Sequence, residues 1–273
     1  MNKYAFITMD VESFFDTYCM NKRGIEKDES FDCSKEVERF IDYLTNLGIK
    51  ATLFVNISFL PRVKTALLKA KALGFDIALH SLEHRPAVKY TIEEFRESVQ
   101  KAKDILKQEL DIVPNGYRFP GFKFTQEHLQ VIKDEGFIYD SSYQKEPKDY
   151  QKLHDNVYVK DDFYEFSLSR KFMLFKRMNI SGGGNLRLLP FKMTYRKITT
   201  YVKKHDSYVL YFHPFEIYEG TFPKYKKLNI FQKLYINQNR NTFFNKIDMV
   251  INLLKQEGYH FLTMSEYIKN HAE

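Results

Sequence analysis

The chain has 273 residues, of which 44% are hydrophobic and 16% are aromatic. This length and composition exclude a disordered chain and allow one large folded domain or two small ones. The formal net charge of +7 comes from lysines spread along the chain, which is typical of a solvated surface, with a basic face for an anionic glycan, a membrane surface or nucleic acid as the alternative.

The N-terminal sequence MNKYAFITMDVE lacks the charged leader and the apolar stretch of a secretory signal. No window of about 18 apolar residues predicts a membrane span. Cys19 and Cys33 form neither a disulfide framework nor a cysteine-rich zinc motif, so we expect free thiols. These features predict a cytoplasmic protein with no transmembrane segment.

Short apolar runs alternate with amphipathic stretches through the first 140 residues. The pattern predicts strands at 4–10, 50–56, 75–80, 115–120 and 137–142, and helices at 35–48, 63–74, 91–110 and 125–135. The middle of the chain, 150–190, is less regular. The alternation then resumes with a helix at 191–204, a strand at 207–213, a helix at 241–257 and a strand at 259–264.

These strands are too apolar for a sheet with one wet face, so they predict an α/β fold with a buried parallel sheet. About seven parallel strands in one unbroken chain favour a distorted (β/α)7 barrel of the TIM type over an open sheet. No internal repeat or linker divides the sequence. We therefore expect residues 1–273 to form a single catalytic domain.

Polar residues stand at the ends of the predicted strands, where the chemistry of parallel α/β folds gathers. In chain order these residues are Asp10 and Glu12, His80 and His84, Arg118, Asp140, and His213. Two neutral imidazoles and a carboxylate can bind a divalent metal and leave positions open, and such a metal makes its water a nucleophile near neutral pH. With a carboxylate as general base and an imidazolium as general acid, these groups predict hydrolysis of an amide or ester.

Five motifs at these strand ends resemble the metal-dependent polysaccharide deacetylases, which are carbohydrate esterases with NodB homology. The motifs are TMDVE (8–12), HSLEH (80–84), RFPGF (118–122), DSSY (140–143) and YFHP (211–214). The resemblance implies a distorted barrel, usually loaded with zinc, that removes N- or O-acetyl groups from sugars. DVE, GGGNLRLLP (182–190) and HPFEI (213–217) are most similar to a bacterial subgroup tied to exopolysaccharide, capsule or lipopolysaccharide synthesis.

The resemblance also implies a role for each matching residue. His80 and His84 take the positions of the two metal-binding histidines. Asp10 takes the position of the catalytic base, Arg118 that of the arginine that tethers the base, and His213 that of the general acid.

The first motif departs from the commonest family pattern. Many members carry two consecutive aspartates there, and the second is the metal carboxylate. Here that position is Val11, which cannot bind a metal. In the D-V-[DE] branch the acidic residue one position further on serves the metal, so we assign Glu12 as the third ligand. On a regular strand Asp10 and Glu12 point to the same face.

Four further residues complete the expected site. Gly121 matches the position whose backbone N–H helps to stabilise the oxyanion. Ser141 and Tyr143 of the DSSY motif are grouped with Gly121 as oxyanion or substrate residues. Asp140 is expected to raise the pKa of His213, with ordinary turn chemistry as the alternative.

The leading hypothesis is a metal-dependent hydrolase that removes an N-acetyl group from a sugar of a bacterial surface polysaccharide or its precursor. We expect one divalent metal, with Zn²⁺ ahead of Co²⁺ and Ni²⁺, and an N-acylated sugar or glycan as substrate, with no nucleic acid partner. A deformylase or another hydrolase of linear C–N amide bonds would use the same residues. A catalytically inactive glycan-binding protein is the third hypothesis, motivated by Val11. The sugar, the acyl group, its carrier and the oligomeric state are left open by the sequence.

Overall fold

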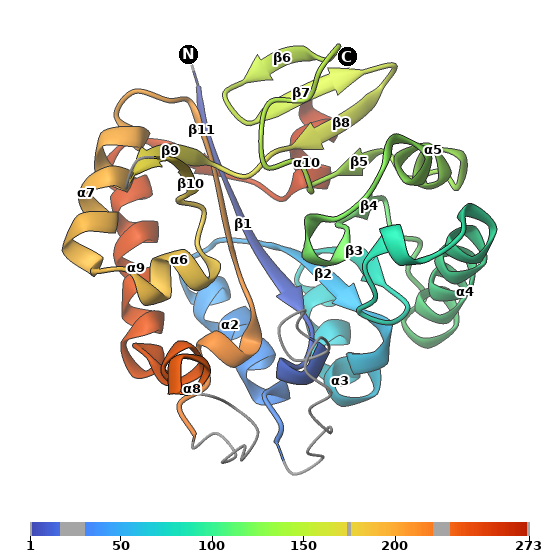
Figure 1. Cartoon of the computed structure of the whole chain (residues 1–273), viewed down its shortest axis with the longest axis horizontal. Coiled ribbons are helices and arrows are strands. Elements are labelled where there is room, and N and C mark those ends of the chain that lie inside the picture. Colours follow the sequence, from blue (N-terminus) through green and yellow to red (C-terminus); the bar gives the residue numbers. More distant parts are fainter. Residues whose placement is uncertain (1, 17–30, 174–175, 221–229, 272–273) are drawn as a thin grey trace.

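The computed structural model describes residues 2–16, 31–173, 176–220 and 230–271 (Figure 1). Within these residues, seven neighbouring parallel strands of the main sheet follow the order β11-β1-β2-β3-β4-β5-β8. They are β1 (Lys3–Val11), β2 (Thr52–Asn56), β3 (Asp76–Ser81), β4 (Gly116–Tyr117), β5 (Tyr139–Asp140), β8 (Phe163–Phe166) and β11 (Ser207–Phe212). The sheet is a nearly closed barrel, so the predicted distorted (β/α)7 fold is confirmed.

Helices surround the sheet, with α7 and α9 on one side, α2 and α3 below, and α4 and α5 on the other side in the view of Figure 1. Their bounds are α2 (Ser34–Asn46), α3 (Leu60–Ala72), α4 (Ile92–Leu110), α5 (Gln126–Asp134), α7 (Phe191–Val202) and α9 (Arg240–Gln256). Each matches a predicted helix within a few residues. The start of α4 shows why: Thr91 and Glu94 form a capping box, which the Thr-x-x-Glu spacing encodes.

Alternation along β1 separates two apolar layers. Ala5, Ile7, Met9 and Val11 belong to the large core cluster that includes the surrounding helices. Tyr4 and Phe6 belong to a second cluster with residues of the other barrel strands, such as Phe54 of β2 and Val209 of β11. Because successive side chains of a strand point to opposite faces, the even-numbered residues of β1 face the barrel interior. Asp10 therefore points into the barrel, and Val11 packs on the helices.

The second half of the chain adds elements that the sequence pattern did not predict. They include the parallel strand β8 itself and the strands β6 (Gln151–His154) and β7 (Val157–Lys160), which extend the sheet antiparallel from β8. The others are the hairpin of β9 (Arg170–Met173) and β10 (Lys176–Asn179) and the helices α6 (Gly183–Leu188), α8 (Ile230–Asn237) and α10 (Met264–His271). The strand β12 (Tyr259–Phe261) pairs with the first residues of β1. Prediction of a strand to 264 was too long because Thr263 and Glu266 cap the start of α10.

The structure also bears on the expected free thiols and on the expected absence of a membrane span. Cys33 is a buried free thiol, whereas Cys19 lies outside the described residues. Within the described ranges, every helix falls short of the length or the apolar character that crossing a membrane requires.

Candidate active site

The end of β1 presents two buried carboxylates. Asp10 and Glu12 are almost fully buried, and the backbone N–H of Glu12 donates to the carbonyl of Asp10 over 3.0 Å as the chain leaves the strand. Burying a carboxylate is costly unless it meets hydrogen-bond donors, cations or a metal. The surroundings of these two side chains therefore decide what the site can do.

Glu12, His80 and His84 gather into one group whose ligand atoms all lie within 4.8 Å of one another. Glu12 Oε2 lies 2.8 Å from His84 Nε2 and 3.5 Å from His80 Nε2. This oxygen is buried and faces both imidazole nitrogens. Two imidazole nitrogens and one carboxylate oxygen that converge in this way fit a divalent metal such as zinc.

Contacts behind this group orient one of its histidines. His80 Nδ1 lies 2.7 Å from the backbone carbonyl of Arg118. A carbonyl only accepts, so Nδ1 carries the hydrogen and Nε2 keeps its lone pair for a metal. Burial would raise the pKa of Glu12, but the charge of His84 and the hydrogen bonds with His80 and His84 lower it below its ordinary value. Glu12 is therefore ionised, as a metal ligand must be.

Arg118 fixes the second carboxylate, Asp10. Its Nη1 donates to Asp10 Oδ1 over 2.7 Å and to Thr8 Oγ1 over 2.9 Å. Its Nε and Nη2 donate to the carbonyl and the hydroxyl of Ser141, and its guanidinium lies 3.9 Å from the centre of the Phe54 ring. Arg118 is fully buried, and these contacts together fix the orientation of its guanidinium group. Asp10 Oδ2 is left to face the metal group.

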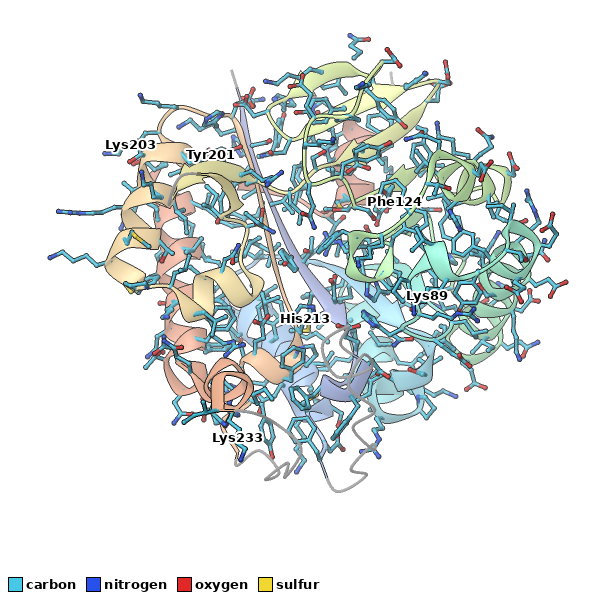
Figure 2. The ribbon with its side chains drawn as sticks, viewed as in Figure 1. Lys89, Phe124, Tyr201, Lys203, His213 and Lys233 are labelled. Atoms are coloured by element: carbon cyan, nitrogen blue, oxygen red, sulfur yellow. The ribbon has the colours of Figure 1, made fainter. Side chains whose placement is uncertain are left out.

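His213 lies just after β11 (Figure 2). Its Nε2 is 3.4 Å from Glu12 Oε1 and 3.8 Å from Asp10 Oδ2. Its Nδ1 contacts Glu216 Oε2 at 2.9 Å, and Arg187 Nε donates to Glu216 Oε1 over 3.3 Å. Burial lowers the pKa of His213, but the hydrogen bond and charge of Glu216, followed by the charges of Glu12 and Asp10, raise it to about 9.

The carboxylate beside His213 is therefore Glu216, where the sequence led us to expect Asp140. The described residues contain no hydrogen bond or ion pair between Asp140 and His213. Asp140 is fully buried and instead accepts hydrogen bonds from the backbone N–H and the hydroxyl of Ser142. The signal for Glu216 was present in the sequence, because it follows His213 by three residues in the HPFE motif and forms a capping box with it.

Ser141 also differs from its expected place. Its hydroxyl donates to the carbonyl of Phe166 and accepts from Arg118 Nη2, and the side chain is fully buried. Both partners belong to the protein, so we place Ser141 behind Arg118 instead of against a substrate. Tyr143 is partly buried and its hydroxyl accepts from Gln126 Nε2 over 2.7 Å.

Gly121 lies in the turn η4 (Pro120–Phe122) that follows Arg118. Its φ of 61° is in the left-handed region, which side chains other than glycine adopt at a cost. The turn thus depends on a glycine at this position. A glycine is also required at position 182, in the GGG stretch of residues 182–184. A Cβ there would lie only 2.2 Å from the backbone oxygen of Tyr211, which is two residues before His213.

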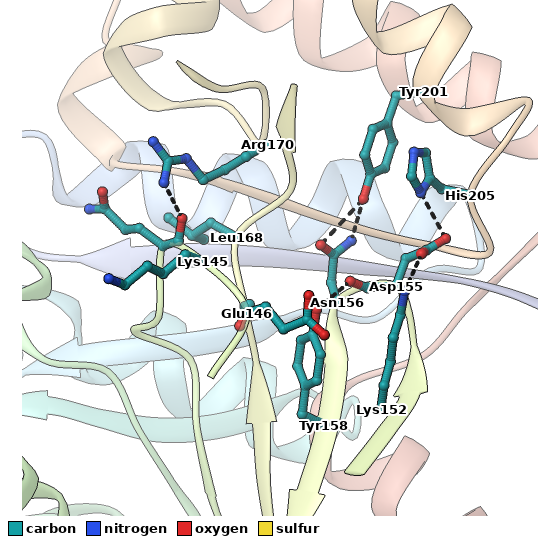
Figure 3. Close-up of a pocket in the computed structure, with 12 residues that line it drawn as sticks. Lys145, Glu146, Lys152, Asp155, Asn156, Tyr158, Leu168, Arg170, Tyr201 and His205 are labelled. Carbon is teal, nitrogen blue, oxygen red and sulfur yellow. Dashed lines mark hydrogen bonds and ion pairs between the residues drawn. The ribbon is translucent and has the colours of Figure 1, made fainter. Parts of the chain in front are cut away.

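A pocket lies apart from these residues, between β6, β7, the segment 144–146 and the end of α7 (Figure 3). Its volume is about 370 Å³. Asn156 donates to Tyr201 and to the carbonyl of Ser207, and His205 pairs with Asp155 at 2.8 Å. These contacts join the antiparallel extension to the barrel.

Residues 27–139 match the sequence model described as polysaccharide deacetylase. Residues 27–139 belong to the polysaccharide deacetylase family. His80, His84, Arg118 and Gly121 fall inside the matched segment. Residues 143–269 match a domain of unknown function, DUF3473, which includes His213 and Glu216. No curated protein matches the chain.

Solved structures share the fold at low sequence identity. A polysaccharide deacetylase candidate from Mycobacterium smegmatis is 14% identical with a TM-score of 0.65, covering 99% of this chain and 91% of that one. The Bc1960 peptidoglycan N-acetylglucosamine deacetylase is 13% identical with a TM-score of 0.58, covering 97% and 87%. The protein BA3943 from Bacillus anthracis, described as a CE4 family pseudoenzyme, is 11% identical with a TM-score of 0.57, covering 98% and 66%.

Proposed function

We propose that this protein is a metal-dependent hydrolase that removes the N-acetyl group from a sugar of a bacterial surface polysaccharide or its precursor, with the whole chain acting as one catalytic domain. The observation that carries the proposal is the gathering of Glu12, His80 and His84 with Asp10 on one side and His213 on the other. The family supports the acyl-sugar substrate class. Val11 does not weaken the site, because Glu12 supplies the carboxylate that Val11 lacks.

Glu12, His80 and His84 would hold one divalent ion, with Zn²⁺ ahead of Co²⁺ and Ni²⁺, and the bound ion would polarise the amide carbonyl and acidify water. Asp10 Oδ2 takes a proton from the attacking water, while Arg118 holds Oδ1 and keeps the carboxylate oriented. The backbone N–H of Gly121 is proposed to help stabilise the oxyanion.

After Asp10 has taken a proton from water, His213 donates a proton to the leaving amine. Its Nδ1 bonds to Glu216, so Nε2 is the atom that faces the site and protonates the leaving amine. One water and one amide thus yield a carboxylic acid and a free amine. Glu216, held by Arg187, keeps the ring oriented and charged.

The proposal is tested by release of acid from N-acyl sugars. Purified protein is incubated with Zn²⁺, Co²⁺ or Ni²⁺ and a panel of N-acetylated and N-formylated sugars, as monosaccharides, oligosaccharides and lipid-linked forms, and acetate and formate are measured by mass spectrometry. We expect metal-dependent acetate release. Formate alone would assign a deformylase. Stoichiometric metal with no acid from any substrate would favour a glycan-binding protein without turnover.

Replacing Glu216 tests the assignment of the general acid. In Glu216→Gln the charge that raises the pKa of His213 is gone, so this pKa falls toward its ordinary value. The protonated form of His213 is then lost at lower pH, and we expect the alkaline limb of kcat/KM to move to lower pH. The pH profile measures this shift. Glu219→Gln is the matched control, because Glu219 is exposed and pairs with Arg39; an equal shift there, or none in Glu216→Gln, would remove Glu216 from this role.

A further inference from the structure

Two carboxyl groups lie side by side beneath the site. Asp140 of β5 and Glu165 of β8 are neighbours in the register of these parallel strands, and both are fully buried. Each carboxyl group is close enough to shift the pKa of the other. Two buried carboxylates side by side repel each other and offer no donor to one another, so a proton held between them satisfies both.

The surroundings decide which group holds the proton. Arg118 is the cation near both groups, and it already pairs with Asp10. Burial and the charge of Asp140 raise the pKa of Glu165 well above its ordinary value. Burial also raises the pKa of Asp140, to about 6, while hydrogen bonds from Glu165 and Ser142 oppose the rise. At neutral pH Glu165 is therefore the neutral donor and Asp140 the ionised acceptor.

Asp140 holds the segment that carries Arg118. It accepts from the hydroxyl of Ser142 over 2.7 Å, and that hydroxyl accepts from the backbone N–H of Phe119 over 2.8 Å. Phe119 stands between Arg118 and the turn that contains Gly121. Ionised Asp140 thus fixes the direction in which the hydroxyl of Ser142 points, which leaves its lone pair for Phe119.

Glu165 anchors the same segment from the other side. Its Oε1 accepts from the backbone N–H of Tyr143 over 3.0 Å. Its Oε2 is buried with no conventional hydrogen-bond partner among the described residues, as expected for the oxygen turned to a second carboxyl group. The chain from 140 to 143 is therefore tied down at its ends by Asp140 and Glu165 and in its middle by Arg118.

We propose that Asp140 and a neutral Glu165 form a positioning pair that clamps the Arg118–Gly121 segment through Ser142 and so sets the place of the base and of the oxyanion donor. This role rests on the proposed hydrolase function. It also gives the DSSY motif a function that differs from tuning His213. Glu165 is assigned no role by the family motifs, and Glu216 already occupies the position at His213.

Three variants test the pair. Glu165→Gln keeps a neutral side chain that can donate to Asp140, so we expect kcat within about threefold of the parent. Glu165→Ala removes the donor, and Asp140→Asn places an amide NH₂ against the donors of Ser142. In each of these two variants we expect kcat to fall by about 10–100-fold. This is the size expected when reacting groups shift by a fraction of an ångström to 1 Å. Metal content should stay stoichiometric in all three. Glu127→Gln, at an exposed position, is the control.

A second measurement does not depend on activity. Amide hydrogen exchange at Phe119 should become faster in Glu165→Ala and Asp140→Asn and stay unchanged in Glu165→Gln. If the parent protein released no acid from any substrate, the hydrolase proposal would fail while this exchange pattern would still support the clamp. Equal loss of activity in Glu165→Gln and Glu165→Ala would overturn the neutral-donor assignment. A shifted alkaline limb of kcat/KM in Asp140→Asn, with exchange at Phe119 unchanged, would return Asp140 to the role of tuning His213.

Discussion

We expect His80→Ala to lose its bound metal and its hydrolase activity together. His80 provides one of three ligand atoms, and its ring is aimed by the hydrogen bond from Nδ1 to the carbonyl of Arg118. Losing a residue that only orients a ligand typically costs 10–100-fold in metal affinity or activity, so the loss of the ligand itself should exceed about 100-fold. Metal content by mass spectrometry and acetate release are measured on the same protein sample.

The controls for this variant separate metal loss from unfolding. His260→Ala changes an exposed histidine and should keep both metal and activity. His84→Ala should behave like His80→Ala, because His84 Nε2 lies 2.8 Å from the same carboxylate oxygen. Circular dichroism should show the barrel folded in all three. Stoichiometric metal in His80→Ala would refute the ligand set.

The fold and the metal group follow from local rules that the sequence displays. Apolar runs mark the strands, and the period of two along β1 places Asp10 on the inner face and Val11 on the helices, with Glu12 directly after the strand. His80 stands next to the last residue of β3, and His84 follows four residues later, at a spacing that metal-binding histidines can have. Because the carboxyl ends of parallel strands lie at one rim of the barrel, residues distant in sequence are expected to meet there. This expectation does not require knowing which strands are neighbours.

The supporting carboxylates could not be assigned in this way. Asp140 and Glu216 both stand close to a strand end, and only the three-dimensional packing decides which of them reaches His213. Glu165 lies in a strand of the irregular middle region, and its importance comes from its register partner, Asp140. Arg187 follows the glycine-rich turn, where Gly182 lies against the backbone of Tyr211, and donates to Glu216 over 3.3 Å. Such contacts depend on how strands and turns far apart in the sequence align with one another. Composition and hydrophobic periodicity give no information about that alignment.

Asp10→Asn should retain the metal and lose turnover. Asp10 is not among the three ligands, whereas its Oδ2 faces the site as the proposed base. An amide cannot take the proton from water, so we expect kcat to fall by about 10²–10⁴-fold, the usual contribution of general acid–base catalysis. Single-turnover acetate release and metal content of the same preparation measure the two effects separately.

The fold should survive this substitution, because the introduced amide still offers an oxygen to Arg118 Nη1 and the guanidinium keeps its bonds to Thr8 and Ser141. We expect a loss of about 1–3 kcal/mol in the free energy of unfolding, the cost of a buried polar group left partly satisfied, measured by urea denaturation. Asp42→Asn, at an exposed ion pair with Lys69, should change neither quantity. A near-normal rate in Asp10→Asn with full metal would remove Asp10 from catalysis. Loss of the metal would instead make Asp10 part of the ligand set.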